Sequence, residues 1–147
     1  SYRSTTVKVY LTYKSNLEAI KASSSSSVTG KSVIKSNEMS VKVSSSAFAD
    51  LSVDAKELDI DVSSSARASL EVNAQDLDVE VTSSGRLELT GRTSFQRFHI
   101  SSSGSAEISV SEELIADASS SGRISYKGNP EKVIVDASSS GKVRKAN

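Results

Sequence analysis

The sequence predicts an all-β fold, a right-handed parallel β-helix (β-solenoid) of about seven coils with about 19 residues each. The first observation behind this prediction is a regular series of serine clusters. The last serines of these clusters are Ser27, Ser46, Ser65, Ser84, Ser103, Ser121 and Ser140, at intervals of 19, 19, 19, 19, 18 and 19 residues. The second observation is an alternation of apolar and polar residues between the clusters, which is typical of a strand with one buried face.

Each repeat is expected to contribute two short strands. One precedes the serines, as at 58–62, 77–81 and 133–137, and the other follows them, as at 49–53, 68–72, 87–89 and 106–110. Such a repeat cannot bury its apolar face alone, so successive coils should stack in register with parallel strands about 4.8 Å apart. A small residue directly after the last serine suits a tight bend; these residues are Ala47, Ala66, Gly85, Gly104, Gly122 and Gly141.

Three segments depart from the regular pattern. Asn16 to Ala22 and Glu112 to Ala116 are helix-like, but both are too short to predict a long helix. Gly91 to Gln96 is expected to form an irregular loop, and Phe95 and Phe98 near it are the aromatic residues best placed for exposure and ligand contact. The favoured interpretation is nevertheless that these rings pack in the core against a coil edge.

The two ends of a solenoid leave strand edges without a neighbour, which favours pairing with another chain. Thr5 to Tyr13 alternates like a strand of a first coil without its predecessor, so at the N-terminal end we expect either end-to-end self-association or a missing domain. At the other end, Lys142, Arg144 and Lys145 are expected to discourage edge pairing.

Length and composition limit the domain organisation and the partners. The chain has 147 residues, of which 36% are hydrophobic, and this suffices for a single solenoid domain over residues 1–147. The formal net charge is zero, from 18 basic and 18 acidic residues, so no global field would recruit nucleic acid or an anionic membrane. Cysteine is absent, and no apolar run is long enough to span a bilayer. We therefore expect no nucleic-acid partner and no membrane insertion.

Serine accounts for 35 residues, and its placement suggests a structural role. If the strand parity continues into the turns, one serine per coil points inward and forms an internal ladder whose hydroxyls bond to one another or to turn carbonyls. The predicted ladder consists of Ser26, Ser45, Ser64, Ser83, Ser102, Ser120 and Ser139. The alternative, a catalytic serine, requires a histidine base, and the single histidine, His99, lies on the outward parity of its strand.

Two charged ladders are predicted on the outer surface, each with one residue per coil. The acidic ladder, interrupted by His99, consists of Asp61, Glu80, Asp117 and Asp136, and the basic ladder of Arg67, Arg86, Arg123 and Lys142. In the structural interpretation, screening by salt and pairing between the ladders reduce the repulsion between like charges. In the functional interpretation, the two ladders and Phe95 form a ligand-binding face. The carboxylates could hold calcium, but no calcium-binding loop motif occurs, so we expect no metal and no cofactor.

Enzyme motifs are absent from the sequence. There is no glycine-rich phosphate loop, no HExxH and no GxSxG. Asp59 and Asp78 could act as an acid and base pair on an outer sheet, but residues repeated on successive coils share nearly the same environment, which disfavours two separated pKa values. The predicted function is a cell-surface adhesin or structural binding module without catalysis. The alternative is a glycan-binding or glycan-cleaving β-helix.

Three groups of residues resemble a known family. They are Val7-Lys-Val-Tyr-Leu-Thr followed by Leu17 to Ser23, the internal repeats, and Tyr126-Lys-Gly-Asn-Pro130 leading to Ser-Gly-Lys at 140–142. Together they are similar to the head GIN domain of auto-transporter adhesins (DUF2807). The resemblance implies a pectin-lyase-like β-helix, exported to the periplasm, outer membrane or cell surface, in lipoproteins of Bacteroidetes. It also implies an unknown surface protein or polysaccharide as partner, additional N-terminal coils that this chain lacks, and no defined catalytic residues.

Overall fold

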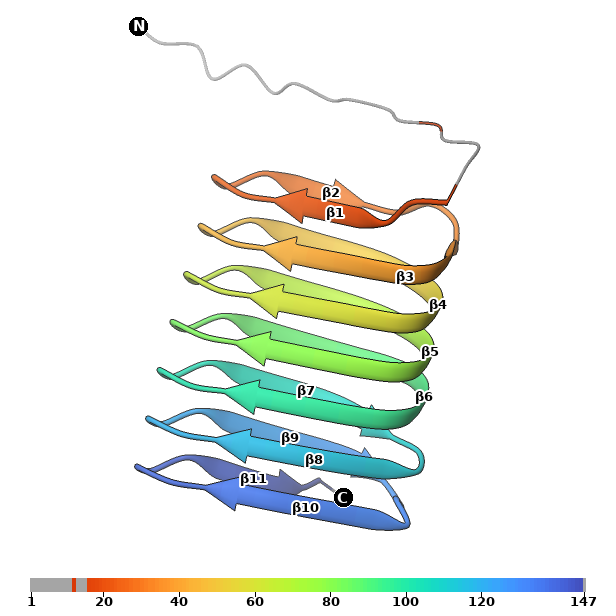
Figure 1. Cartoon of the computed structure of the whole chain (residues 1–147). Helices are drawn as coiled ribbons and strands as arrows, with labels where there is room; N and C mark the ends of the chain where they lie inside the picture. Colours follow the sequence, from red (N-terminus) through yellow and green to blue (C-terminus); the bar gives the residue numbers. More distant parts are fainter. Residues whose placement is uncertain (1–11, 13–15, 147) are drawn as a thin grey trace, which may run out of the picture.

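The structure is a computed structural model that describes residue 12 and residues 16–146 (Figure 1). Successive coils pair with each other in register throughout this part of the chain. All strand pairs within this part of the chain are parallel, they form a β-solenoid of about 7 turns, and no helix is present there. The predicted fold class is therefore confirmed. The strands are β1 (Ala19–Ala22), β2 (Ser27–Thr29), β3 (Ile34–Val43), β4 (Phe48–Val62), β5 (Arg67–Val81), β6 (Arg86–Ile100), β7 (Ser105–Val110), β8 (Glu113–Ala118), β9 (Arg123–Gly128), β10 (Lys132–Ala137) and β11 (Lys142–Lys145).

Each coil passes through two faces of the solenoid. Figure 1 shows β1, β8, β10 and the later halves of β3 to β6 on the front face, with β2, β7, β9 and β11 behind them. In the middle coils one 15-residue strand covers both faces, where the sequence suggested two short strands. Two successive exposed residues at the bend, such as Lys56 and Glu57, shift the inward parity so that both halves bury their apolar side chains.

The core consists of columns of equivalent apolar side chains. Register places Val41, Ile60 and Val79 in one column, and each of them is 2% exposed or less. Each inner coil is covered by the coil before and the coil after it, so one alternating strand buries its inward side chains completely. The helix-like fragments of the sequence take part in this arrangement as strands β1 and β8, because pairing with neighbouring coils outweighs their weak local preference.

The serine clusters form the turns at one edge of the solenoid, and here the structure differs from the sequence prediction. In each turn two consecutive serines have positive φ, and the following residue donates its N–H to the carbonyl three positions earlier, as Ala66 does to Ser63. This is the backbone of a type I′ turn. The ladder expected inside consists instead of exposed residues: Ser26, Ser45, Ser64, Ser83, Ser102, Ser120 and Ser139. Inward parity does not continue into the turn. In the six residues from Ser45 to Ser139 the left-handed conformation rotates the side chain outward, whereas Ser26 follows the left-handed pair of its turn and is exposed in the first coil.

The first coil also has a different register from the one predicted. Ser24 and Ser25 have positive φ, and the N–H of Ser25 donates to the carbonyl of Ser45. Ser25 is thus the equivalent of Ser46, an interval of 21 residues, whereas the sequence prediction used Ser27. Ser26, predicted as the first rung of the serine ladder, takes the place occupied by Ala47 in the second coil.

The expected loop at Gly91 to Gln96 lies within β6 and continues the stack. Phe98 is fully buried in the core, in agreement with the favoured interpretation of core packing, while Phe95 is half-buried. Gln96 is buried in the column of Leu77 and Leu114. Its amide nitrogen donates to the carbonyl of Ser109 at 2.9 Å, just beyond Ile108, where pairing between β6 and β7 ends.

Replacing a left-handed serine by glycine should stabilise the protein. Ser65 has φ of 66° at the third position of its turn, where glycine is preferred. Because a non-glycine residue pays roughly 1–2 kcal/mol there, Ser65→Gly should raise the free energy of unfolding by about 0.5 kcal/mol after the added chain entropy is subtracted. Ser65→Val should lower it by about 1–2 kcal/mol. Urea unfolding measures both values.

The matched control is Ser69→Gly, which makes the same substitution in β5 at a residue without positive φ. This variant should lose about 0.5–1 kcal/mol. If Ser65→Gly is as destabilising as Ser69→Gly, this result would contradict a left-handed conformation at Ser65.

Candidate functional site

A hollow on the rear face is the main candidate for a binding site. It has a volume of about 520 Å³ and extends across β6, β7, β9 and β11. Its floor is the backbone of these strands, and its space comes from two serines: Ser105 stands in register between Arg86 and Arg123, and Ser125 between Glu107 and Arg144. A short side chain flanked by long ones in the same column leaves a depression in an otherwise flat sheet.

Cationic side chains dominate the lining of this hollow, which we call the basic hollow. Four cations, Arg86, Arg123, Lys142 and Arg144, stand against the carboxylates Glu88 and Glu107. Within the described part of the chain none of these four cations forms an ion pair, and all four are exposed. Guanidinium groups with free N–H donors are suited to bidentate contact with a carboxylate or sulfate.

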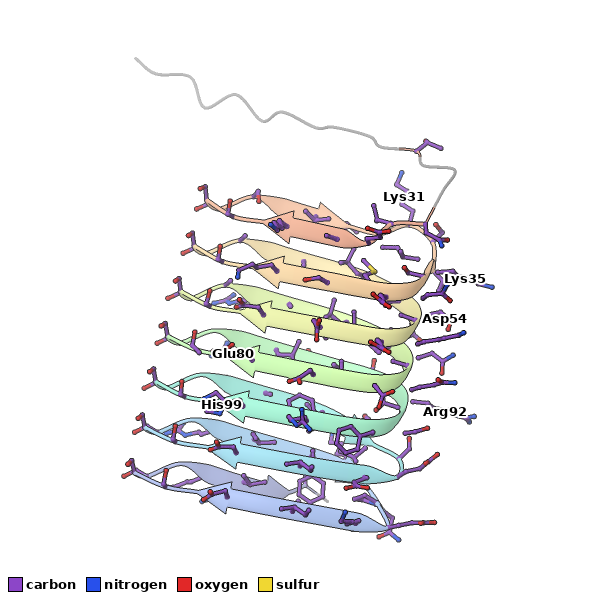
Figure 2. The ribbon with its side chains drawn as sticks, viewed as in Figure 1. Lys31, Lys35, Asp54, Glu80, Arg92 and His99 are labelled. Atoms are coloured by element: carbon purple, nitrogen blue, oxygen red, sulfur yellow. The ribbon has the colours of Figure 1, made fainter. Side chains whose placement is uncertain are left out.

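The front face carries the acidic ladder. Register places Asp61, Glu80, His99, Asp117 and Asp136 in one column, as the sequence predicted, and Figure 2 shows Glu80 and His99 one above the other on this face. Nδ1 of His99 and Oδ2 of Asp117 are 3.0 Å apart and share a hydrogen bond. The basic ladder lies in its own column on the rear face, so the structure does not bring the two ladders together.

Three neighbouring columns on the front face carry acidic residues over two coils, and we call this group the acidic grid. Its six residues pair in register across two coils: Glu57 with Asp76, Asp59 with Asp78, and Asp61 with Glu80. In the part of the chain that the structure describes, the cations that pair with the grid lie at its margins, where Lys42 is 2.8 Å from Asp61 and Arg97 is 3.4 Å from Asp78. The hydrogen bond and charge of Asp61 raise the pKa of Lys42 above its ordinary value.

The acidic side chains do not converge on a single point. A second hollow, of about 460 Å³, lies at the N-terminal side of the grid, and its carboxylates are Glu18, Glu38, Glu57 and Asp59. Among the described residues, no group of three or more histidine, aspartate or glutamate side chains is placed to hold a metal ion. Asp59 and Asp78 are direct register partners on an exposed surface, and Asp78 does not line this second hollow.

Two further predicted positions have simple surroundings. Phe95 stacks under Arg97, whose guanidinium carbon is 5.6 Å from the ring centre. At the bend, Asn73 stands between Asp54 and Arg92 in one column and donates a hydrogen bond of 3.2 Å to Asp54; Figure 2 shows Asp54 and Arg92 pointing away from the coils. These contacts hold side chains in place along the outer surface and do not enclose a cavity.

The basic hollow was only partly visible in the sequence. The cations of the basic ladder were predicted, but Arg144, Ser105 and Ser125 were missed. The missing signal is the comparison of residues down a column, which shows where a small side chain interrupts a series of long ones.

Neutralising one member of the acidic grid should stabilise the protein. Asp59 faces Asp78 directly, and like charges in this position repel. Asp59→Asn should raise the free energy of unfolding by about 0.2–0.5 kcal/mol at low salt, and the gain should vanish in 1 M salt because the charges are screened. Asp50→Asn is the control, since its register partners Thr29 and Ser69 are uncharged. A stability loss for Asp59→Asn would show that the carboxylate makes an attractive contact.

Comparison with known proteins identifies the family. In the part of the chain that the structure describes, no helix is long and apolar enough to cross a membrane. Neither the comparison with curated proteins nor that with solved structures gave a match. The family model described as "Putative auto-transporter adhesin, head GIN domain" matches residues 1–130, which is most of the 147-residue chain. The chain therefore belongs to the family of auto-transporter adhesin head GIN domains.

Proposed function

We propose that this protein is a non-catalytic surface adhesin module whose basic hollow binds an acidic polysaccharide. The observation that carries the proposal is the group of four exposed cations around a depression on a rigid sheet, none of which forms an ion pair with another described residue. Membership of an adhesin family supports an exported or surface-located binding role. Zero net charge removes long-range attraction but leaves this local cationic surface available at short range.

The spacing of the cations suits a polymer with regularly placed anionic groups. Successive coils are about 4.8 Å apart, so Arg123 and Lys142 present charges at one strand spacing, and Arg86 follows two coils away. A uronic-acid chain lying along the solenoid axis can place one carboxylate near each cation. Glu88 and Glu107 border the site and would disfavour a ligand whose anionic groups fall outside these positions.

The strands supply the rigidity that such a site needs. The hollow is built on β6, β7, β9 and β11, whose backbones are fixed by pairing with neighbouring coils. Few backbone degrees of freedom are then lost on binding, so weak contacts can add up along a polymer. End-to-end self-association, expected from the open strand edges of a solenoid, also belongs to this proposal because it multiplies the number of sites.

Charge reversal in the hollow tests the proposal. Purified protein is titrated with polygalacturonate, and neutral dextran serves as the comparison polymer. Wild-type protein should bind polygalacturonate with strong salt dependence, and Arg123→Glu should weaken binding at least about tenfold, because each charge-assisted contact contributes about 1.5–3 kcal/mol. Arg123→Lys should give an intermediate loss, since it keeps the charge without the bidentate geometry.

The matched control is Arg92→Glu, which makes the same charge change at the bend, outside the hollow. It should change polygalacturonate affinity by less than the Arg123 variant. Equal losses in both variants, or no polygalacturonate binding by the wild type, would contradict the proposed site. Release of new reducing ends in the same samples would show a glycan-cleaving enzyme instead.

A further inference from the structure

The C-terminal end of the solenoid exposes the cross-section of its core. Within the described residues, β10 pairs only with β8 and β11 only with β9, so the other edge of each strand has no partner. Val133 and Val135 lie in the columns of Leu114 and Ala116, which are buried. Their exposed fractions are nevertheless 38% and 47%, because no described coil follows.

At the N-terminal end of the solenoid, the first coil terminates the same core columns. Among described residues, β1 pairs only with β3 and β2 only with β4. The residues of β1 and β2 that lie in the apolar core columns are Ile20, Ala22 and Val28, of which Ile20 and Val28 are half-buried. The free strand edges at the two ends are therefore complementary: each is the edge that pairs with the other between successive coils.

We propose that β10 and β11 of one molecule stack on β1 and β2 of a second copy, head to tail and in the register used between coils. This inference extends the end-to-end association of the proposed function. Following the columns through the structure, the register places Val135 next to Ile20, Ala137 next to Ala22, and Val143 next to Val28. Apolar columns then continue from one molecule into the next.

The serine turns offer a matching backbone contact. Between coils, the N–H of the second left-handed serine donates to the carbonyl of the first left-handed serine in the following coil, from Ser25 and Ser45 through to Ser121 and Ser139. The next donor in this series is Ser140 and the preceding acceptor is Ser24. In the proposed contact the N–H of Ser140 donates to the carbonyl of Ser24 in the second copy.

Charge selects this orientation. The column that contains the acidic ladder carries opposite charges at its two ends, because it begins with Lys21 and ends at Asp136. Head-to-tail stacking brings Asp136 next to Lys21 of the second copy. A lysine and an aspartate one strand spacing apart in this same column, Lys42 and Asp61, already form an ion pair of 2.8 Å.

Among the described residues, no like charges face each other in this register. Lys142 and Arg144, which were expected to discourage edge pairing, lie in the columns of Ser27 and Thr29. Tail-to-tail pairing would instead crowd these basic side chains against those of a second copy. The basic residues therefore disfavour the wrong partner end without opposing the head-to-tail contact.

Residues 5–13 are the competing occupant of the first coil's edge. Their alternation of apolar residues is that of a strand, and they lie outside the described residues. If they cover β1 and β2 of their own molecule, the second copy cannot dock and the protein is a monomer.

Sedimentation velocity of the full chain over a wide concentration range tests the inference. Wild-type protein should form oligomers with increasing concentration. Asp136→Lys and Lys21→Asp should each weaken association about five- to tenfold by placing like charges together, and the double swap should restore it. Glu71→Lys, on the rear half of β5 with register partners on β4 and β6, should leave association unchanged.

The outcomes separate this inference from polysaccharide binding. Arg123→Glu should lose polygalacturonate affinity and still associate, since Arg123 lies on β9 and not at the end strands β10 and β11. Val135→Asp, at a residue already 47% exposed, should abolish association with an unchanged circular dichroism spectrum. A monomeric wild type at all concentrations, or a double swap that fails to restore association, overturns the head-to-tail contact.

Discussion

The stack depends on one backbone constraint, the reversal of the chain at two consecutive left-handed serines in every coil. Each reversal fixes the end of one strand and the start of the next, and the N–H of its second serine is bonded to the following coil, as Ser65 is to Ser83. A residue with a side chain pays about 1 kcal/mol or more for this conformation. The cost is offset by hydrogen bonds within and between the turns, so the strained conformation is stable only because the coils are stacked.

Stacking in register has a direct consequence for the surface, because any outward residue type that recurs in the sequence becomes a column in space. Where carboxylates recur, the column accumulates repulsion, as in the acidic grid, and cations such as Lys42 relieve it only at the margins. Where long cations alternate with serine, as around Ser105, the column contains a depression with free donors. The same rule therefore produces an electrostatic cost on one face and an exposed cationic depression on the other.

The column rule also explains what could be predicted from the sequence. The period and the alternation predicted the coils, the inward apolar residues of the regular repeats and the columns of both charged ladders, because these depend only on counting residues. The serine conformation could not be predicted this way, since positive φ arises from the tight turn that joins two strands and from its hydrogen bond to the next coil. Five consecutive serines at 23–27 allow several alignments, so the register of the first coil was set by pairing of Ala22 with Val43 rather than by sequence spacing. The basic hollow depends on neighbours 18 or 19 residues away, which reading along the chain does not compare.

Both departures from the 19-residue period fall on the side of the coil away from the serine turns. The two extra residues of the first coil lie between Thr29 and Ile34, and the missing one lies between Ile108 and Glu113. The bend can absorb a change in length because its residues face solvent and a side chain can replace a lost backbone partner, as Gln96 does at Ser109. The serine edge cannot, because one added residue would break both the turn and its bond to the next coil. Length changes are therefore confined to the bend edge, and the two flat faces with their charged columns keep the same register from the first coil to the last.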